Sequence, residues 1–226
     1  MPVYWLNDDP TAFPDPEGAN EMGMVALGGD LSAERLLNAY HLGMFPWFSE
    51  GEPIMWWSPD PRFVLFPTNL KVAKSMRPYF NQRKFTATYD HNFRAVITAC
   101  QKAYRPGQHG TWITEEMLEA YCQLHELGFA HSVEVWKGKE LVGGLYGLAL
   151  GRIFFGESMF ARVSNASKFG FISLVRRLHE RSYTLIDCQQ ETRHLASLGA
   201  QSIPRSTFLQ YLAENDLKKT EKGKWK

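Results

Sequence analysis

The chain has 226 residues, of which 44% are hydrophobic and 14% are aromatic. At roughly 150 residues per domain, this length allows one large domain or a small domain followed by a mid-sized one. The composition excludes disordered, collagen-like and coiled-coil proteins. No apolar run approaches the roughly 18 residues of a membrane span. The first residues hold acids where a signal peptide has bases, so a cytoplasmic protein is expected.

The formal net charge of +1 conceals an uneven distribution of charged residues. Residues 1–60 contain ten acids and one base, which gives −9 and leaves +10 for the rest of the chain. The sign changes at a Pro-Asp-Pro sequence over residues 59–61, which is typical of a hinge. We therefore expect a small domain over residues 1–60, a larger one over 61–217 and a frayed, lysine-rich tail over 218–226.

Several common site signatures are missing from the sequence. The three cysteines, Cys100, Cys122 and Cys188, show no CxxC spacing, which argues against a disulfide framework or a zinc ribbon. No HExxH, P-loop or GxGxxG motif occurs, so no metal is expected. Ser158 lacks the closing glycine of a nucleophile elbow and is not expected to act as a nucleophile.

In the first sixty residues the sequence predicts one helix, over residues 32–42, because a serine cap precedes apolar residues at helical spacing and a glycine follows. The remainder of this segment is expected to form loops. These loops are aromatic, with Trp47, Trp56 and Trp57 within eleven positions. The rings either wedge the small domain against the larger one or stack on a base of a ligand.

After the hinge, strands and helices alternate before three strands form an antiparallel meander. Thr114 caps one of the predicted helices, and residues 105–110 are expected to form a mobile loop before it. The order of elements predicts an α+β fold. The predicted strands are 62–66, 84–89, 131–136, 141–150, 153–160 and 184–189, and the predicted helices are 69–80, 92–103, 114–127, 165–179, a short one near 196 and a serine-capped one over 206–214.

A cluster of bases without any acid lies on and after the second predicted helix. It includes Lys71, Lys74, Arg77, Arg83 and Lys84. The cluster is either a solvated helix face or a patch that follows phosphate groups, because unpaired like charges repel one another unless an anion binds them.

Two carboxylates interrupt apolar strands. Alternation of side chains predicts that Glu157 shares one face of its strand with Phe155 and Met159, and that Asp187 shares a face with Gln189. A carboxylate in the middle of an apolar strand is costly to desolvate unless it is paired, which indicates a functional group.

The alternative interpretation is that these carboxylates are structural. Backbone amides, Arg152 or Arg162 would then satisfy them. Because two such carboxylates flank one predicted helix, the functional interpretation is favoured.

Nine short runs occur in order over most of residues 26–199. They are 26–30 (ALGGD), 43–48 (GMFPWF), 56–62 (WWSPDPR), 110–114 (GTWIT), 131–136 (HSVEVW), 143–147 (GGLYG), 155–160 (FGESMF), 165–168 (NASK) and 185–189 (LIDCQ). Together these runs resemble those of the bacterial leucyl/phenylalanyl-tRNA:protein transferase family. Residues 1–12, about 68–109 and the lysine-rich tail resemble the family less closely.

The resemblance implies a cytoplasmic enzyme that moves leucine or phenylalanine, and less readily methionine, from aminoacyl-tRNA to the N-terminal Lys or Arg of a protein. This transfer marks the protein for degradation through the N-end rule. The resemblance also implies a small N-terminal domain, a second domain related to the N-acetyltransferase (GNAT) fold with a mixed sheet, and no metal or small-molecule cofactor.

Three other functions compete with this one. A peptidoglycan-type aminoacyl-tRNA transferase is the closer chemical relative, but its known members are larger chains. An acyl-CoA-dependent N-acetyltransferase has a pyrophosphate loop, Q/R-x-x-G-x-G/A, which is missing after Phe160. A non-catalytic tRNA-binding adaptor would explain the bases and the aromatic rings but would leave Glu157 and Asp187 without a role.

The resemblance places Asp187 and Gln189 at the ester of the aminoacyl-tRNA. Asp187 is expected to hold or deprotonate the incoming amine, directly or through Gln189, and Glu157 to favour the cationic protein N-terminus or to order this network. An α-amino group has a pKa of about 7.7 to 8.0, so a modest base is sufficient. Which carboxylate takes the proton is left open.

The resemblance also assigns residues to the tRNA and to the amino acid. Trp47 and Trp112 are expected to clasp the terminal adenosine. The amino-acid pocket is expected between the sheet, where Met159 lies beside Glu157, and the following helix, where Phe171, Leu174 and Val175 recur at helical spacing. The resemblance adds Leu145, Phe154 and Ile186. By position alone, Lys74, Arg77, Arg83 and Lys84 are expected to follow the phosphates of the acceptor stem.

Overall fold

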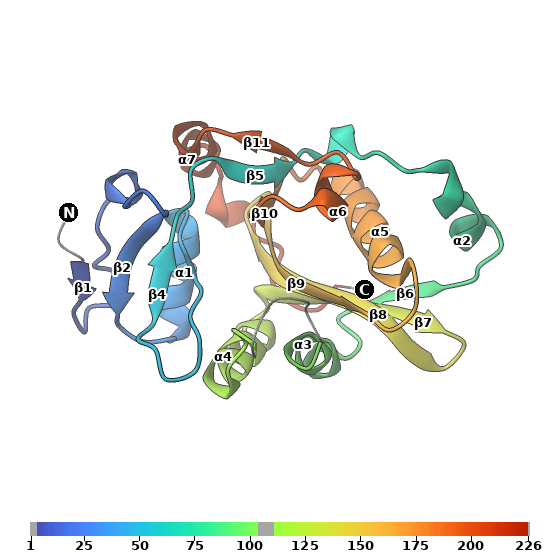
Figure 1. The fold of residues 1–226 in the computed structure, drawn as a ribbon, viewed down its shortest axis with the longest axis horizontal. Helices are drawn as coiled ribbons and strands as arrows, with labels where there is room; N and C mark the ends of the chain where they lie inside the picture. The colour runs from blue at the N-terminus through green and yellow to red at the C-terminus, as the bar shows by residue number, and fades with distance from the viewer. Residues whose placement is uncertain (1–3, 104–110, 226) are drawn as a thin grey trace.

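The structure is a computed structural model that describes residues 4–103 and 111–225. Its strands form two sheets, one of four strands and one of seven (Figure 1). The predicted loop over 105–110 lies outside the described residues. The strand order of the small sheet is β1-β2-β4-β3, with β1 parallel to β2 and the other pairs antiparallel. These strands are β1 (Tyr4–Leu6), β2 (Met24–Gly28), β3 (Phe45–Pro46) and β4 (Met55–Trp57).

The helix predicted in the first sixty residues is confirmed as α1 (Ala33–His41), and the Ser32 side chain caps it. The prediction that loops make up the rest of this segment is wrong. The missed strands have only two to five residues, so alternation of side chains cannot reveal them. A 3₁₀ turn, η1 (Pro16–Gly18), separates the first two of them.

The large sheet has the order β11-β5-β10-β9-β8-β7-β6. Its central pair, β9 and β10, is parallel, and every other pair is antiparallel, so the predicted α+β class with a mixed sheet is confirmed. The meander is confirmed as β7, β8 and β9, whereas the three-residue β11 was not predicted. The strands are β5 (Arg62–Leu65), β6 (Thr86–Tyr89), β7 (Ala130–Lys137), β8 (Glu140–Leu150), β9 (Ile153–Ala161), β10 (Leu185–Gln189) and β11 (Gln201–Ile203).

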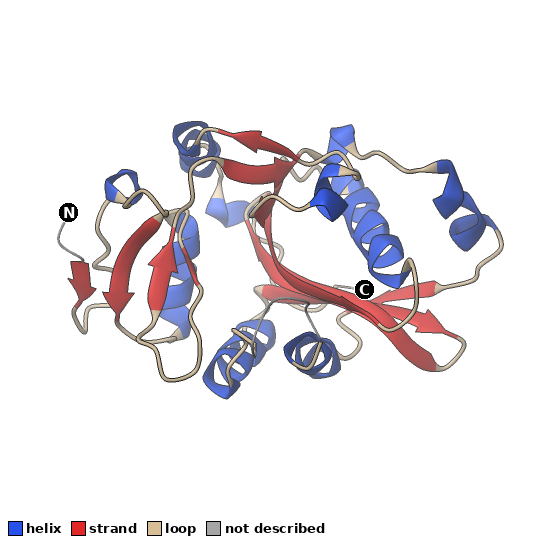
Figure 2. Cartoon of the chain, in the orientation of Figure 1, coloured by secondary structure: helices blue, strands red, loops and turns tan. Residues whose placement is uncertain are grey.

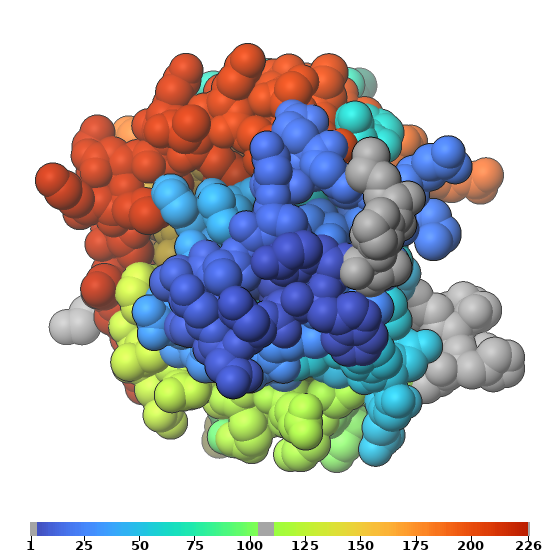
Figure 3. All heavy atoms as spheres, turned by 90° about the vertical axis from the view of Figure 1, so that its left-hand side faces the viewer, coloured from blue at the N-terminus to red at the C-terminus, as the bar shows by residue number. Residues whose placement is uncertain are grey.

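Helices cover both faces of the large sheet (Figure 2). Helices α3 (Phe93–Gln101) and α4 (Glu115–Glu126) pack on one face, and α5 (Ala166–Glu180) packs on the other. The core on the side of α3 and α4 is continuous with the small sheet through Tyr40, Met44 and Trp56. In an end-on view the N-terminal residues lie between α4 and the C-terminal segments (Figure 3). The division into domains at residue 60 stays a prediction.

Two helix predictions need correction. Residues 69–80 do not form one helix, because Pro78 cannot occupy a helix interior and instead stands in the first turn of α2 (Arg77–Asn81). In helix α7 (Arg205–Ala213) Pro204 occupies the N-cap position and no side chain caps the helix, so the predicted cap by Ser206 is wrong. The remaining short elements are η2 (Pro67–Asn69), η3 (Lys74–Met76), α6 (Arg193–Ala196) and η4 (Leu217–Lys219). Across the described residues, no helix is both long and apolar enough to cross a membrane.

The C-terminal tail is packed against the large sheet, so the prediction that it is frayed is wrong for residues 218–225. Trp225 is only 4% exposed and stacks on His131 with ring centroids 4.0 Å apart. Its backbone N–H donates to Asp90 over 2.6 Å, and Glu221 pairs with Arg152 and Arg181. A single buried tryptophan therefore anchors a segment whose lysines suggested disorder.

We expect Trp225→Ala to lower the free energy of unfolding by about 3 kcal/mol, because it empties a large buried site. Urea denaturation of the full chain measures the change. Lys224→Ala, at an exposed neighbouring position, is the control. Equal stabilities of the two variants would show that the tail does not contribute to the fold.

Candidate active site

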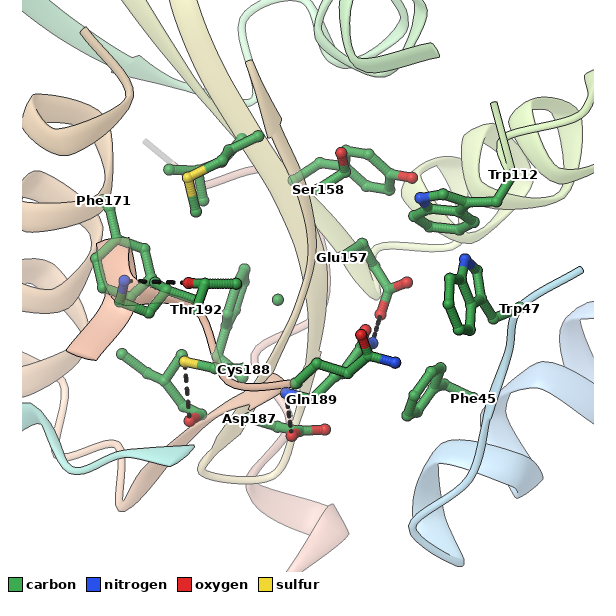
Figure 4. A pocket seen from close by; sticks show the side chains of 18 of the residues that line it. Phe45, Trp47, Trp112, Glu157, Ser158, Phe171, Asp187, Cys188, Gln189 and Thr192 are labelled. Atoms are coloured by element: carbon green, nitrogen blue, oxygen red, sulfur yellow. Dashed lines mark hydrogen bonds between the residues drawn. The ribbon is translucent and has the colours of Figure 1, made fainter. Parts of the chain in front are cut away.

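A cavity of about 320 Å³ opens where β9 and β10 diverge (Figure 4). The two strands pair only over residues 185–187 and 153–155, and beyond that point both strands line the cavity. Phe45, Trp47 and Trp112 lie at one end of the cavity and Phe171 lies at the other. Such an opening between parallel strands is a common place for a ligand to bind.

A buried ion pair lies beneath this cavity. The guanidinium of Arg62, on β5, donates from Nε to Asp187 Oδ1 over 2.8 Å and from Nη2 to Oδ2 over 2.6 Å. Both side chains are fully buried. The guanidinium also lies 4.9 Å from the ring centroid of Phe45 and 4.6 Å from that of Phe208. The pair therefore joins the large sheet, the small sheet and α7.

The partner of Asp187 is Arg62. It is neither of the two arginines, Arg152 and Arg162, that were expected if the carboxylates were structural. Arg152 pairs with Glu221, and Arg162 donates to the carbonyl of Leu141. Asp187 Oδ1 also accepts the backbone N–H of Gln189 over 2.9 Å. Both carboxylate oxygens of Asp187 are thus engaged by groups of the protein.

Gln189 connects Asp187 to the second carboxylate. Its backbone is left-handed, with φ of 61°, which turns the chain at the end of β10. The side-chain amide Nε2 donates to Glu157 Oε1 over 2.9 Å. Arg62, Asp187, Gln189 and Glu157 therefore form one continuous hydrogen-bonded chain.

A β-bulge places Glu157 in the cavity. In the pairing of β9 with β8, Ser158 lies opposite Tyr146 and Gly156 opposite Gly147, so Glu157 has no partner on β8. The extra residue shifts the alternation: Phe155 packs in the core on the side of α3 and α4, whereas Met159 packs on the side of α5. The prediction that Met159 shares a face with Glu157 is therefore wrong.

The environment of Glu157 sets its protonation. Burial raises the pKa of its carboxyl from 4.5 to about 7, and the nearby charge of Asp187 acts in the same direction. The hydroxyls of Tyr40 and Tyr121 and the charge of Arg62 oppose this rise. The Tyr121 hydroxyl donates to Glu157 Oε2 over 3.1 Å and is itself hydrogen-bonded to the Tyr40 hydroxyl. Near neutral pH, Glu157 can both accept and release a proton.

Both tyrosines remain protonated in this setting. Burial raises the pKa of Tyr40 and of Tyr121 well above the usual value, and the charge of Glu157 adds to the effect. They therefore act as fixed donors toward the carboxylate.

The structure brings together most of the site residues expected from the sequence. Trp47 and Trp112 line the same cavity as Glu157, Asp187 and Gln189. The carbonyl of Trp47 accepts the indole N–H of Trp57 over 2.7 Å, and this bond helps to fix the segment that carries Trp47. Five of the seven residues expected in the amino-acid pocket also line the cavity: Leu145, Phe154, Met159, Phe171 and Ile186.

Leu174 does not belong to the described lining of the cavity and is fully buried in the core between α5 and the sheet. It lies about one turn, some 5 Å, beyond Phe171 along α5. Val175, beside it, is buried in the same core.

Comparisons with known proteins identify the family. Residues 64–213 match the family model described as leucyl/phenylalanyl-tRNA protein transferase, and residues 29–60 match that of its N-terminal domain. The chain belongs to this family. The predicted enzyme class, an aminoacyltransferase, is thereby confirmed.

Relatives in this family align along nearly the whole chain. A leucyl/phenylalanyl-tRNA–protein transferase of Myxococcus xanthus is 55% identical over 226 residues, which covers 100% of this chain and 97% of that protein. One from Pseudomonas fluorescens strain Pf0-1 is 56% identical over 215 residues, 94% of this chain and 95% of the relative. Among solved structures, a GCN5-related N-acetyltransferase from Kribbella flavida overlays with a TM-score of 0.39 at 12% identity, covering 74% and 59% of the two chains.

The bases assigned to tRNA phosphates lie away from the cavity. Lys74, Arg77, Arg83 and Lys84 are exposed, and none of them lines it. They belong to the segment around α2, at the opposite end of the molecule from α1 (Figure 1).

Sequence reasoning did not find Arg62, Tyr40 or Tyr121. Arg62 had one available signal, since it is a charged residue at the start of the otherwise apolar strand β5. The two tyrosines occupy apolar positions of α1 and α4, where they resemble ordinary core residues.

We expect Arg62→Met to lower the free energy of unfolding by about 3 to 5 kcal/mol, because it leaves the buried Asp187 charge without a partner. The double variant Arg62→Met/Asp187→Leu should recover much of this loss, since it removes both charges. Urea denaturation measures both. A double variant as unstable as the single one would contradict the assigned pairing.

Proposed function

We propose that this protein transfers leucine or phenylalanine, and less readily methionine, from aminoacyl-tRNA to the N-terminal Lys or Arg of a protein in the cytoplasm, which marks that protein for degradation. The observation that carries the proposal is the position of Glu157. Its carboxyl has a pKa of about 7 and lies in the cavity that also holds two indole rings and an apolar end.

The reaction requires alignment and the management of one proton. The amine nitrogen forms a bond to the ester carbonyl carbon, and the bond from that carbon to the ribose oxygen breaks. Because the ester is already activated, holding it beside the amine supplies much of the rate enhancement. An α-amino group with a pKa of about 7.7 to 8.0 has a usable neutral fraction at pH 7.

We assign the proton to Glu157. Its carboxylate accepts the proton that the amine loses on attack, and it returns this proton to the departing ribose oxygen, so the group ends the reaction unchanged. A pKa near the working pH suits both steps. Its negative charge also favours the approach of a cationic protein N-terminus.

Asp187 has a different role in this proposal. Its two oxygens are engaged by Arg62 and by the backbone of Gln189, so it has little capacity to accept a further proton. We assign it as a positioning residue that holds Gln189. Gln189 in turn orients the Glu157 carboxylate through the 2.9 Å bond from Nε2.

The aromatic end of the cavity suits the terminal adenosine of tRNA. Trp47 and Trp112 lie together at that end, beside Glu157. Single-stranded ends of RNA are held by stacking on aromatic rings, at about 1 to 3 kcal/mol per base. We therefore propose that the two indoles clasp the adenine.

The apolar end of the cavity suits the amino-acid side chain. Its walls are Leu145, Phe154, Met159, Phe171 and Ile186. Leucine, phenylalanine and methionine have no branch at Cβ and enter such a pocket, whereas the β-methyl groups of isoleucine and valine meet its walls. Discrimination by one methyl group is worth about 1 to 3 kcal/mol.

We further propose that Lys74, Arg77, Arg83 and Lys84 contact phosphates of the acceptor stem. All four are exposed. They belong to the segment around α2, and a cluster of exposed cations attracts the phosphates of a duplex (Figure 1).

A transfer assay with labelled Leu-tRNA and a peptide that begins with Arg tests the function. We expect Glu157→Gln to lower the single-turnover rate by about 10²-fold or more. The rate of the unaltered protein should rise as pH increases through about 7, because the carboxylate form of Glu157 fills over that range. The variant should lose this limb and keep only the rise that comes from deprotonation of the amine, with its pKa of about 7.7 to 8.0.

Glu126→Gln, which changes an exposed carboxylate on α4, is the matched control and should leave the rate and the profile unaltered. Absence of transfer by the unaltered protein would refute the function. A limb near pH 7 that persists in Glu157→Gln would refute the role of Glu157 alone.

A further inference from the structure

A second cavity adjoins the candidate active site on the face covered by α3. It is an open groove of about 840 Å³ between α3 and the end of β9. Met159 lines both this groove and the active-site cavity. At the end of α3, Gln101 donates from Nε2 to the carbonyl of Ile113 over 3.1 Å, so this end of the groove lies beside the segment that carries Trp112.

The groove is positively charged. Arg94, Lys102 and Arg162 line it, and the described residues of its lining include no acid. All three are exposed. Arg94 is paired with Glu119 on α4, so its charge is offset. The other two cations are therefore the ones available to a ligand.

Lys102 and Arg162 differ in how they are held. Arg162 lies 5.7 Å from the ring centroid of Phe160 and donates from Nη1 to the Leu141 carbonyl over 3.2 Å, which orients its guanidinium. The ammonium of Lys102, at the end of α3, has no hydrogen-bond or ion-pair partner in the described part of the chain. One fixed and one adjustable cation thus flank the same groove.

The side of α3 that faces the groove has small side chains. Ala95 and Ala99 lie one turn apart on α3, and Ala103 follows the end of the helix. Their methyl groups leave room for a chain to lie along the helix, and the hydroxyl of Thr98 adds a polar group. The groove is therefore lined by both polar groups and small side chains.

Two polymers must reach the active site during transfer, and their charges differ. The acceptor protein presents a cationic N-terminus, which this groove would repel. The tRNA presents a single strand with one negative charge per phosphodiester, which two unpaired cations attract. The charge of the groove favours the nucleic acid.

We propose that this groove binds the phosphodiester backbone of the nucleotides immediately before the terminal adenosine, with Lys102 and Arg162 contacting phosphates. The inference rests on the proposed function and deepens it. The single-stranded end and the acceptor stem then contact different cations, in this groove and around α2 respectively.

Two short probes that differ in phosphate content test the proposal. One is phenylalanine joined through an amide to the terminal adenosine of the trinucleotide CCA, which holds two phosphodiesters. The other is the same aminoacyl-adenosine without phosphate. Binding of each is measured by calorimetry between 50 and 200 mM salt, with the full-length chain and with the double variant Lys102→Gln/Arg162→Gln.

For the trinucleotide we expect the variant to show a weaker salt dependence, with a slope of log affinity against log salt smaller by about 1.4, at about 0.7 per lost phosphate contact. The affinity of the unaltered chain for the trinucleotide, divided by that of the variant, should then fall about sevenfold from 50 to 200 mM salt. Affinity for the aminoacyl-adenosine should be unaltered. Unaltered trinucleotide affinity and slope in the variant would overturn the proposal.

Lys139→Gln/Arg176→Gln is the control, because it removes the same charges from exposed positions and Arg176 also lies over a phenylalanine ring, that of Phe80. It should leave both probes unaffected. A raised KM for the acceptor peptide, with trinucleotide binding unaltered in the groove variant, would overturn the proposal by assigning the groove to the acceptor. Failure of the proposed function is detected separately, by the assay with labelled Leu-tRNA and a peptide that begins with Arg.

Discussion

The ion pair between Arg62 and Asp187 is the constraint on which the rest of the site depends. It joins β5 to β10 where no water reaches, and the guanidinium is enclosed by Phe45 from the small sheet and Phe208 from α7. A buried pair of this kind contributes little net stability, but loss of one partner is costly. The pair thus fixes how the small sheet, the large sheet and the C-terminal helix meet around the cavity.

Because Arg62 pairs with Asp187 and not with Glu157, the two carboxylates differ in their charge partners. Asp187 is held by an arginine, whereas Glu157 lies among tyrosine hydroxyls and an amide, and its pKa is raised to about 7 by burial. A paired and an unpaired carboxylate in one network supply a rigid support and a titrating group. The bulge in β9 and the divergence of β9 from β10 give this titrating group access to a ligand.

The sequence predicts an element well where the element is long and its pattern of spacing and capping is local. The capped helix α1, the meander and the two carboxylates in apolar strands could all be predicted from spacing and capping. Strands of two or three residues carry too few positions for a pattern, and one bulge residue reversed the face of Met159. The partner of Asp187 lies 125 residues away, so no local spacing indicates it. The family resemblance assigned the aromatic and apolar ends of the cavity, which periodicity alone leaves as ordinary core.

The central claim is that Glu157 is the titrating carboxylate of the site. Carbon-13 NMR of the full chain labelled at the glutamate side-chain carboxyl measures this directly, with the signal of Glu157 assigned by its loss in the Glu157→Gln spectrum. The account predicts a titration midpoint of about 7 for this signal. A midpoint near the ordinary glutamate value of 4.5 would contradict it, because the carboxylate would then be a much weaker base toward the attacking amine at neutral pH.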